Sequence, residues 1–158
     1  MKELNEQAID EMMRLDNQLC FRLYAASRAV VRMYRPLLDN LGITYPQYLL
    51  LLVLWQWEKE GNAHEKTLKD LCRKLQLDSG TMTPLFRRLE TRGLVKKVQS
   101  QRDGREYFIG LTEEGKALKS EAAEVPKALI CRYGASADLE KGKQLRDLLD
   151  DLLLLVNE

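Results

Sequence analysis

The chain lacks the long hydrophobic segment that a membrane-spanning helix requires. Hydrophobic residues make up 45% of its 158 residues, but the longest uninterrupted apolar run covers only Tyr48–Trp55. A spanning helix needs about 20 apolar residues. Residues 1–6 include acidic side chains and no apolar stretch, so we expect no signal peptide. The composition therefore predicts a globular protein that is neither membrane-embedded nor secreted.

Cysteine and histidine are scarce, which limits metal and disulfide chemistry. The chain has three cysteines and one histidine, and an odd, scattered set of cysteines does not make the disulfide framework of a secreted domain. A reducing, cytoplasmic location is therefore expected. Neither His64 nor the cysteines show the paired spacing of zinc ligands. We expect no metal and no other cofactor.

The net charge is close to zero, but the charges are segregated along the chain. The formal net charge is +1, yet residues 64–105 hold 11 lysines and arginines against 5 aspartates and glutamates. This segment therefore carries +6 and the remainder −5. A basic segment between acidic ones is typical of a surface that binds a polyanion, although a solvated charged face gives the same count.

Hydrophobic residues recur at helical spacing in the first third of the chain. The pattern predicts a helix from residue 8 to about residue 40. After a turn, Thr44 and Gln47 have the spacing of a capping box for a buried helix over 45–58. The polar residues 59–66 predict a loop.

The last third of the chain predicts two further helices. Thr112 is expected to cap a helix that runs to about residue 130, with Pro126 inside it as a break or kink. A last helix is expected to begin within 136–138, and its residues 145–156 form a wide apolar stripe. Burial stabilises each such leucine or valine by roughly 1.5–3 kcal/mol. The stripe therefore predicts a partner.

Between these helices the residues predict a helix-turn-helix followed by a β-hairpin. A short helix over 67–75 and a tight turn precede Asp78, a good N-cap for a helix over 79–92. After this helix the spacing of hydrophobic residues changes from a helical to a strand-like pattern. Two segments rich in β-branched and aromatic residues, 94–99 and 105–111, are joined by a strong hairpin turn signal and predict a wing.

This pattern predicts which side chains would meet DNA, since the second helix of the motif enters the major groove. Hydroxyl and methyl groups in its first turns suit base edges, and later basic residues suit phosphates. The candidate base contacts are Ser79, Thr81, Met82 and Thr83; the candidate phosphate contacts are Arg87, Arg88, Lys96 and Lys97; the candidate wing-tip residues are Arg102, Asp103 and Arg105. Asp103 is expected either to pair with a nearby arginine and aim it at the minor groove, or to serve only as the turn residue.

Several motifs carry a resemblance to a known family. Residues 77–90, 102–105 and 111–115 resemble MarR-type winged-helix repressors. Residues 15–24 and 43–48 are similar to the organic-hydroperoxide-sensing, OhrR-like branch of that family. The resemblance spans nearly the whole chain.

The resemblance implies a mainly α fold with a small β-ribbon wing. Residues 44–111 would form a winged helix-turn-helix DNA-binding region. Residues 1–43 and 112–158 would form helices that hold an obligate homodimer. The dimer would bind a palindromic operator in double-stranded DNA, which agrees with the unpartnered apolar stripe.

The resemblance also implies a sensing site around Cys20. Tyr24 lies one helical turn from Cys20, Tyr34 returns to the same face, and Tyr45 opens the next helix. In the family, phenols matching Tyr34 and Tyr45 bond the reactive sulfur, with Tyr24 near the same pocket. Phenol donors stabilise a thiolate, the form that attacks a peroxide.

The fate of the oxidised sulfur depends on a second thiol. The resemblance implies that Cys131 of the other subunit resolves it as an intersubunit disulfide, although a low-molecular-weight thiol is an open alternative. Cys72 is expected to be a small core residue.

The sequence thus predicts a repressor whose reduced homodimer binds DNA and is released when an organic hydroperoxide oxidises Cys20. One alternative is a MarR-like repressor released by a small aromatic ligand, with Cys20 incidental. A thiol peroxidase is a second alternative, but no catalytic group beyond Cys20 supports it, so we expect no enzyme.

Overall fold

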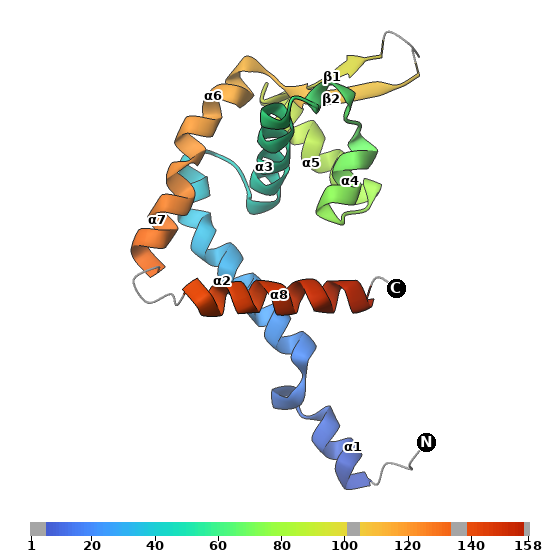
Figure 1. Cartoon of the computed structure of the whole chain (residues 1–158), viewed down its shortest axis with the longest axis vertical. Helices are drawn as coiled ribbons and strands as arrows, with labels where there is room; N and C mark the ends of the chain where they lie inside the picture. Colours follow the sequence, from blue (N-terminus) through green and yellow to red (C-terminus); the bar gives the residue numbers. More distant parts are fainter. Residues whose placement is uncertain (1–5, 101–104, 134–138, 157–158) are drawn as a thin grey trace. The chain divides into compact units, whose positions relative to one another are not determined.

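The computed structural model describes residues 6–100, 105–133 and 139–156, in two compact units that meet between Lys116 and Ala117. The first unit contains α1 (Glu6–Met13), the 3-10 turn η1 (Leu15–Asn17), α2 (Leu19–Asn40), α3 (Tyr45–Glu60), the 3-10 turn η2 (Ala63–Glu65), α4 (Leu68–Leu75), α5 (Ser79–Thr91), β1 (Val95–Gln99) and β2 (Tyr107–Leu111). Helix α6 (Glu113–Ala122) crosses the boundary, and the second unit continues with α7 (Glu124–Tyr133) and α8 (Leu139–Val156). The predicted fold class, mainly α with a β-ribbon wing, is confirmed (Figure 1).

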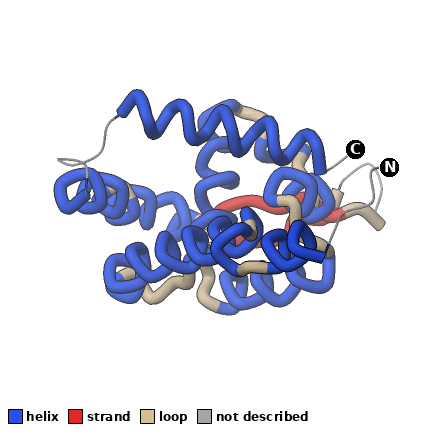
Figure 2. The backbone as a smooth tube through the Cα atoms, turned by 90° about the horizontal axis from the view of Figure 1, so that it is seen from below, coloured by secondary structure: helices blue, strands red, loops and turns tan. Residues whose placement is uncertain are grey.

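The winged-helix core forms around α3. Leu50, Leu51 and Leu54 are completely buried, and α3 contacts α2, α4, α5 and β2. The antiparallel strands β1 and β2 turn Val95 and its partner Leu111 toward this core, and Figure 2 shows them as a short ribbon against the helices. The helix-turn-helix and the wing therefore share one hydrophobic core.

Predicted caps and turns appear where the sequence placed them. The Thr44 N–H donates to Gln47 Oε1 at 2.8 Å, and the Thr81 N–H donates to Asp78 Oδ1 at 2.9 Å. Gly93 has a φ of 68°, the left-handed conformation that ends α5. Helix α3 is two residues longer than predicted and ends at Glu60.

The predicted uninterrupted helix over residues 8–40 is wrong. Gln18 is extended, with φ −85° and ψ 110°, and separates η1 from α2. The Asn17 side-chain amide donates to the Glu11 carbonyl at 2.6 Å, and the Gln18 amide donates to the Met12 carbonyl. These side chains occupy carbonyls that a continuous helix would pair with its own N–H groups. The break makes Cys20 the second residue of α2.

The predicted kink at Pro126 also lies elsewhere. The chain breaks at Ala123, between α6 and α7. Pro126 is in the first turn of α7, where N–H groups have no partner inside the helix. A missing N–H is harmless there, so Pro126 fits a helix start and does not bend a helix interior.

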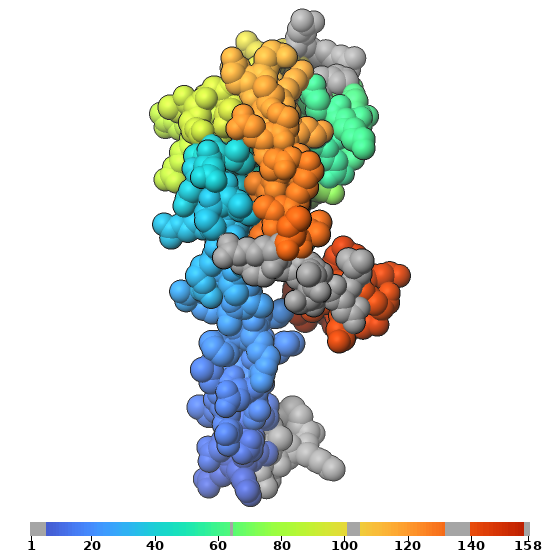
Figure 3. Space-filling model, turned by 90° about the vertical axis from the view of Figure 1, so that its left-hand side faces the viewer, coloured from blue at the N-terminus to red at the C-terminus, as the bar shows by residue number. Residues whose placement is uncertain are grey.

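Apolar side chains remain exposed on the N-terminal and C-terminal helices. They include Leu19, Phe21 and Val30 on α2 and Leu145, Leu148, Leu153 and Leu154 on α8. Figure 3 shows the blue N-terminal segment standing clear of the green and yellow residues of the winged-helix core. The apolar stripe predicted for the last helix is thus present and exposed in the single chain.

Among the described helices, none is by itself long and apolar enough to cross a membrane. Helices α2 and α3 meet such a criterion only as a pair, and they are bent by 76° at their junction.

Gly115 provides a test of the packing between α6 and the core. The indole N–H of Trp55 donates to the Gly115 carbonyl at 2.9 Å, and a Cβ on Gly115 would lie 2.0 Å from the Leu94 carbonyl oxygen. We expect Gly115→Ala to lower the free energy of unfolding by about 1–3 kcal/mol, because backbone atoms must move. Urea unfolding measures the change. Gly142→Ala, on a helix position where a Cβ meets nothing within 4 Å, is the control and should not destabilise; equal losses in the two variants would contradict the packing.

Candidate DNA interface and thiol site

Helix α5 divides its residues between the core and solvent. Met82, Phe86 and Leu89 are buried, because their spacing places them on the side that packs against α3 and α4. The prediction that Met82 contacts a base is therefore wrong, since its side chain has no exposed surface. The exposed candidates on α5 are Ser79, Thr81, Thr83, Arg87 and Arg88.

Two hydroxyl groups at the start of α5 are already used as donors. The Thr81 hydroxyl donates to Asp78 Oδ2 at 2.8 Å, and the Thr83 hydroxyl donates to the Ser79 carbonyl at 2.7 Å. Each hydroxyl oxygen keeps its acceptor lone pairs. Toward an outside partner, these threonines therefore offer an acceptor and a methyl group.

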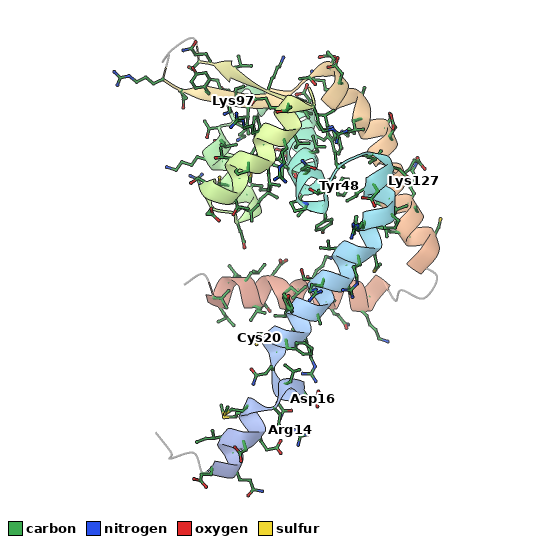
Figure 4. All side chains as sticks on the ribbon, turned by 180° about the vertical axis from the view of Figure 1, so that it is seen from behind. Arg14, Asp16, Cys20, Tyr48, Lys97 and Lys127 are labelled. Carbon is green, nitrogen blue, oxygen red and sulfur yellow. The ribbon has the colours of Figure 1, made fainter. Side chains whose placement is uncertain are left out.

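The two lysines of β1 point to opposite faces of the wing. Lys97 pairs with buried Ile109, and its Nζ lies 5.6 Å from the centre of the Phe86 ring, on the α5 side. Lys96 pairs with Gly110 on the other face, beside Glu58 and Lys116. Figure 4 shows Lys97 on its strand. The strand alternation separates two residues that the sequence grouped together.

The wing tip is only partly described. Arg102 and Asp103 lie outside the described residues, so their predicted pairing has no structural counterpart here. Arg105 is described and exposed.

An arginine that the sequence reasoning missed joins α5 to the end of α2. Arg92, the C-cap of α5, donates from Nη1 to the Gly42 carbonyl and from Nη2 to the Leu41 carbonyl at 3.1 Å. It lines an open depression of about 520 Å³ together with Gln47, Pro84, Arg87, Arg88 and Thr91. The partners lie 50 and 51 residues away in the sequence, so no local pattern signals this contact.

Cys20 is exposed at the N-terminal end of α2. Its thiol donates to Gln18 Oε1, with the sulfur 3.7 Å from that oxygen. The first backbone N–H groups of a helix have no partner inside the helix and form its positive end. The break at Gln18 thus places Cys20 in the first turn of α2, a position hidden by the continuous helix that the sequence predicted.

Two of the three predicted tyrosines, Tyr34 and Tyr45, cluster at the opposite end of α2. The rings of Tyr34 and Tyr45 have centroids 4.8 Å apart, and buried Tyr48, which the prediction missed, lies 5.9 Å from Tyr34. Burial, followed by the nearby Tyr34, raises the pKa of Tyr45 and of Tyr48. These phenols are therefore neutral donors at physiological pH.

The tyrosine cluster does not reach the sulfur within one chain. Tyr34 is 14 residues after Cys20 on the same helix, which separates them by roughly 21 Å along its axis. Figure 4 shows Cys20 and Tyr48 near opposite ends of α2. Tyr24 instead contacts Arg28, whose Nη1 donates to its hydroxyl at 3.3 Å. The shared helix face predicted from the sequence therefore does not bring the Tyr34 phenol to the Cys20 sulfur within a single chain.

The other two cysteines occupy different surroundings. Cys131 is exposed on α7, and Cys72 on α4 is partly exposed. All three cysteines are free thiols. No cluster of three metal-ligating side chains occurs among the described residues.

A second depression, at the corner between α2 and α3, bears on the alternative of an aromatic ligand. It measures about 280 Å³ and is lined by Val31, Arg35, Leu38, Asp39, Ile43, Thr44, Tyr45 and Pro46. Ligand pockets commonly hold roughly 300–1,000 Å³. The volume of this corner lies just below that range.

Comparisons with known proteins agree with this arrangement. Residues 32–122 match the family described as transcriptional regulator SarA/Rot. The organic hydroperoxide resistance transcriptional regulator of Bacillus subtilis is 45% identical over 141 residues, covering 89% of this chain and 90% of that protein. Reduced AbfR bound to DNA has a TM-score of 0.75 and 35% identity, covering 95% and 99% of the two chains. Disulfide-formed AbfR has a TM-score of 0.58 and 35% identity, covering 94% and 99%; AbfR is a protein of Staphylococcus epidermidis.

The Asp78 cap gives a pH-dependent test of the start of α5. Bonds from the Thr81 hydroxyl and N–H hold the pKa of Asp78 below its usual value. A lowered folded-state pKa stabilises the fold above the unfolded pKa of about 3.9 and loses this effect as pH falls through the folded value. We therefore expect Asp78→Ala to lower the Tm at pH 7, and the difference from wild type to shrink below about pH 4.

Circular dichroism melting curves at several pH values measure this difference. Asp78→Asn is the matched control, since an amide keeps an acceptor for the helix N–H but does not titrate. A Tm difference between wild type and Asp78→Ala that stays constant down to pH 2 would contradict a stabilising role of the Asp78 carboxylate as the cap of α5.

Proposed function

Because the chain belongs to the SarA/Rot family of MarR-type winged-helix transcriptional regulators, we propose that it is a DNA-binding repressor that senses organic hydroperoxides through Cys20. One observation carries the proposal. An exposed thiol occupies the first turn of α2 in the same chain as an exposed reading helix. The relative named for organic hydroperoxide resistance supports the sensing role, and the reduced, DNA-bound AbfR supports the DNA-binding role.

The DNA-binding half uses the exposed face of α5. Its polar first turns would enter the major groove, while Arg87 and Arg88, one to two turns later, would hold phosphates. The local charge of +6 over residues 64–105 favours approach to the polyanion. At the groove, Thr81 and Thr83 would accept hydrogen bonds from base amino groups or place a methyl group against thymine.

The functional unit is a homodimer, and the exposed apolar residues of α2 and α8 supply the surface that association would bury. A two-fold dimer presents two recognition helices about 34–36 Å apart, one turn of DNA. A palindromic operator then matches the symmetry of the protein.

The dimer also supplies the phenols that one chain cannot bring to its own sulfur. We infer that Tyr34 and Tyr45 of the second copy donate to the Cys20 thiolate, with Tyr24 at the edge of the same site. The site would therefore be complete only in the dimer.

The oxidation step is a two-electron transfer to the peroxide. The Cys20 thiolate attacks one oxygen of the hydroperoxide; an S–O bond forms as the O–O bond breaks. The alkoxide takes up a proton and leaves as the alcohol, and Cys20 becomes a sulfenic acid. A second thiol then attacks this sulfur, an S–S bond forms, and the hydroxyl leaves as water.

We propose Cys131 of the second copy as the second thiol, although a low-molecular-weight thiol reacts by the same step. The solved disulfide-formed AbfR supports a disulfide within this structural class. A disulfide needs Cβ atoms about 3.8 Å apart. Closing this bond would shift the helices that carry the two winged domains, and the half-site spacing would no longer match.

The role of Cys20 is tested by DNA affinity before and after treatment with tert-butyl hydroperoxide. The probe is the duplex that reduced wild type selects from random double-stranded DNA. We expect wild type to lose affinity by about 5- to 150-fold, the range of allosteric coupling, and Cys20→Ser to lose none. Cys72→Ser is the control and should behave as wild type. Release of Cys20→Ser by the peroxide would show that the sensor is elsewhere.

The role of Cys131 is tested on a non-reducing gel after the same treatment. We expect a dimer-sized band for wild type and for Cys72→Ser, because the proposed bond joins two chains. Cys131→Ser should give no such band, while mass spectrometry should still detect oxidised Cys20. A dimer-sized band that persists in Cys131→Ser would eliminate Cys131 as the resolving thiol.

A further inference from the structure

Arg92 connects the end of the recognition helix to the end of the helix that begins at the sensing thiol. Its guanidinium donates to the carbonyls of Leu41 and Gly42, which immediately follow α2. Gly42 has a φ of 64°, and a Cβ there would lie 3.2 Å from Arg92 Nη2. The arginine is therefore seated closely on this turn.

The chemistry of the contact suits arginine in particular. The last carbonyls of a helix have no partner inside the helix and form its negative end. A planar guanidinium binds two acceptors at once, whereas the ammonium of lysine is a single point of charge. No carboxylate is paired with Arg92 among the described ion pairs, so the carbonyls are its recorded partners.

Within one chain, helix α2 packs against the core mainly at this end. It has 22 residues and a length of about 33 Å, and Leu38, near its C-terminal end, is its buried residue. Cys20 lies at the opposite end. A displacement of the Cys20 end would therefore pass along α2, through the turn that contains Pro36, to the corner that Arg92 binds.

We propose that Arg92 is a positioning residue that transmits the oxidation state of Cys20 from α2 to α5. The inference rests on the proposed redox function. When the Cys20 end of α2 moves, the turn at Leu41 and Gly42 moves with it, and the paired hydrogen bonds carry α5 along. Without Arg92, α5 would keep its packing on α3 while α2 moves, so oxidation would release DNA less effectively.

Arg88 provides a matched control on the same helix. It lines the same depression as Arg92 but, within the described part of the chain, donates no hydrogen bond to the turn after α2. As a candidate phosphate contact, it should contribute to DNA affinity in both oxidation states. Arg88→Met and Arg92→Met each remove one positive charge, from neighbouring turns of α5. Only Arg92→Met also removes the hydrogen bonds to the Leu41 and Gly42 carbonyls.

The experiment measures the affinity of full-length dimers for the selected duplex, reduced and after tert-butyl hydroperoxide. For Arg92→Met, we expect the ratio of oxidised to reduced Kd to fall by about tenfold relative to wild type, comparable to one charge-assisted hydrogen bond. Cys20 should be oxidised at the wild-type rate, as measured by loss of its alkylation. For Arg88→Met, both affinities should fall and the ratio should stay at the wild-type value.

Arg92→Lys keeps the charge and tests the variant fold independently. The ratio of oxidised to reduced Kd should be intermediate, because an ammonium group cannot bind both carbonyls as the planar guanidinium does. The urea midpoint of this variant shows whether the domain is intact. The proposal is overturned if Arg92→Met or Arg92→Lys keeps the wild-type ratio, or if both affinities fall together as in Arg88→Met. A wild-type protein that does not respond to peroxide at all would instead refute the proposed redox function.

Discussion

Burial of α3 is the constraint on which the first unit depends. The helix is apolar on nearly every side, and its leucines are stabilised by roughly 1.5–3 kcal/mol each when buried. Helices α2, α4 and α5 and strand β2 all contact it. Because α5 and the C-terminal end of α2 rest on the same helix, the exposed residues of α5 and the corner next to Tyr34 and Tyr45 are fixed by one core.

Side chains at helix ends then decide where the Cys20 thiol and the exposed residues of α5 lie. Gln18 and Asn17 occupy backbone carbonyls and start a new helix just before the thiol. Asp78 holds the first turn of α5 and takes the hydrogen of the Thr81 hydroxyl. Arg92 binds the carbonyls after α2. In each case a polar side chain satisfies a helix end that would otherwise lack partners, and the functional group beside it acquires a defined environment.

Much of the architecture was predictable because its signals are local. The helix-turn-helix, the hairpin, and the caps at Thr44 and Asp78 follow from periodicity and from side chains within a few residues of the bonds they make. The two boundary errors have the same cause. The helix breaks at Gln18 and at Ala123 depend on which backbone carbonyls accept side-chain hydrogen bonds and on where the next helix begins. The spacing of hydrophobic residues carries no information on either point.

The sequence by itself determined the order and type of the elements, the segregation of charge and the motifs that place the chain in its family. Tertiary structure decided which way the candidate residues face: Met82 points into the core, Lys96 and Lys97 lie on opposite faces of the wing, and Tyr34 and Tyr45 lie far from Cys20 of the same chain. It also brought Arg92 to the carbonyls of Leu41 and Gly42. Caps and turns are bonds between near neighbours, so the sequence specifies them directly. Burial, strand face and the Arg92 contact arise only when segments 50 residues apart pack together.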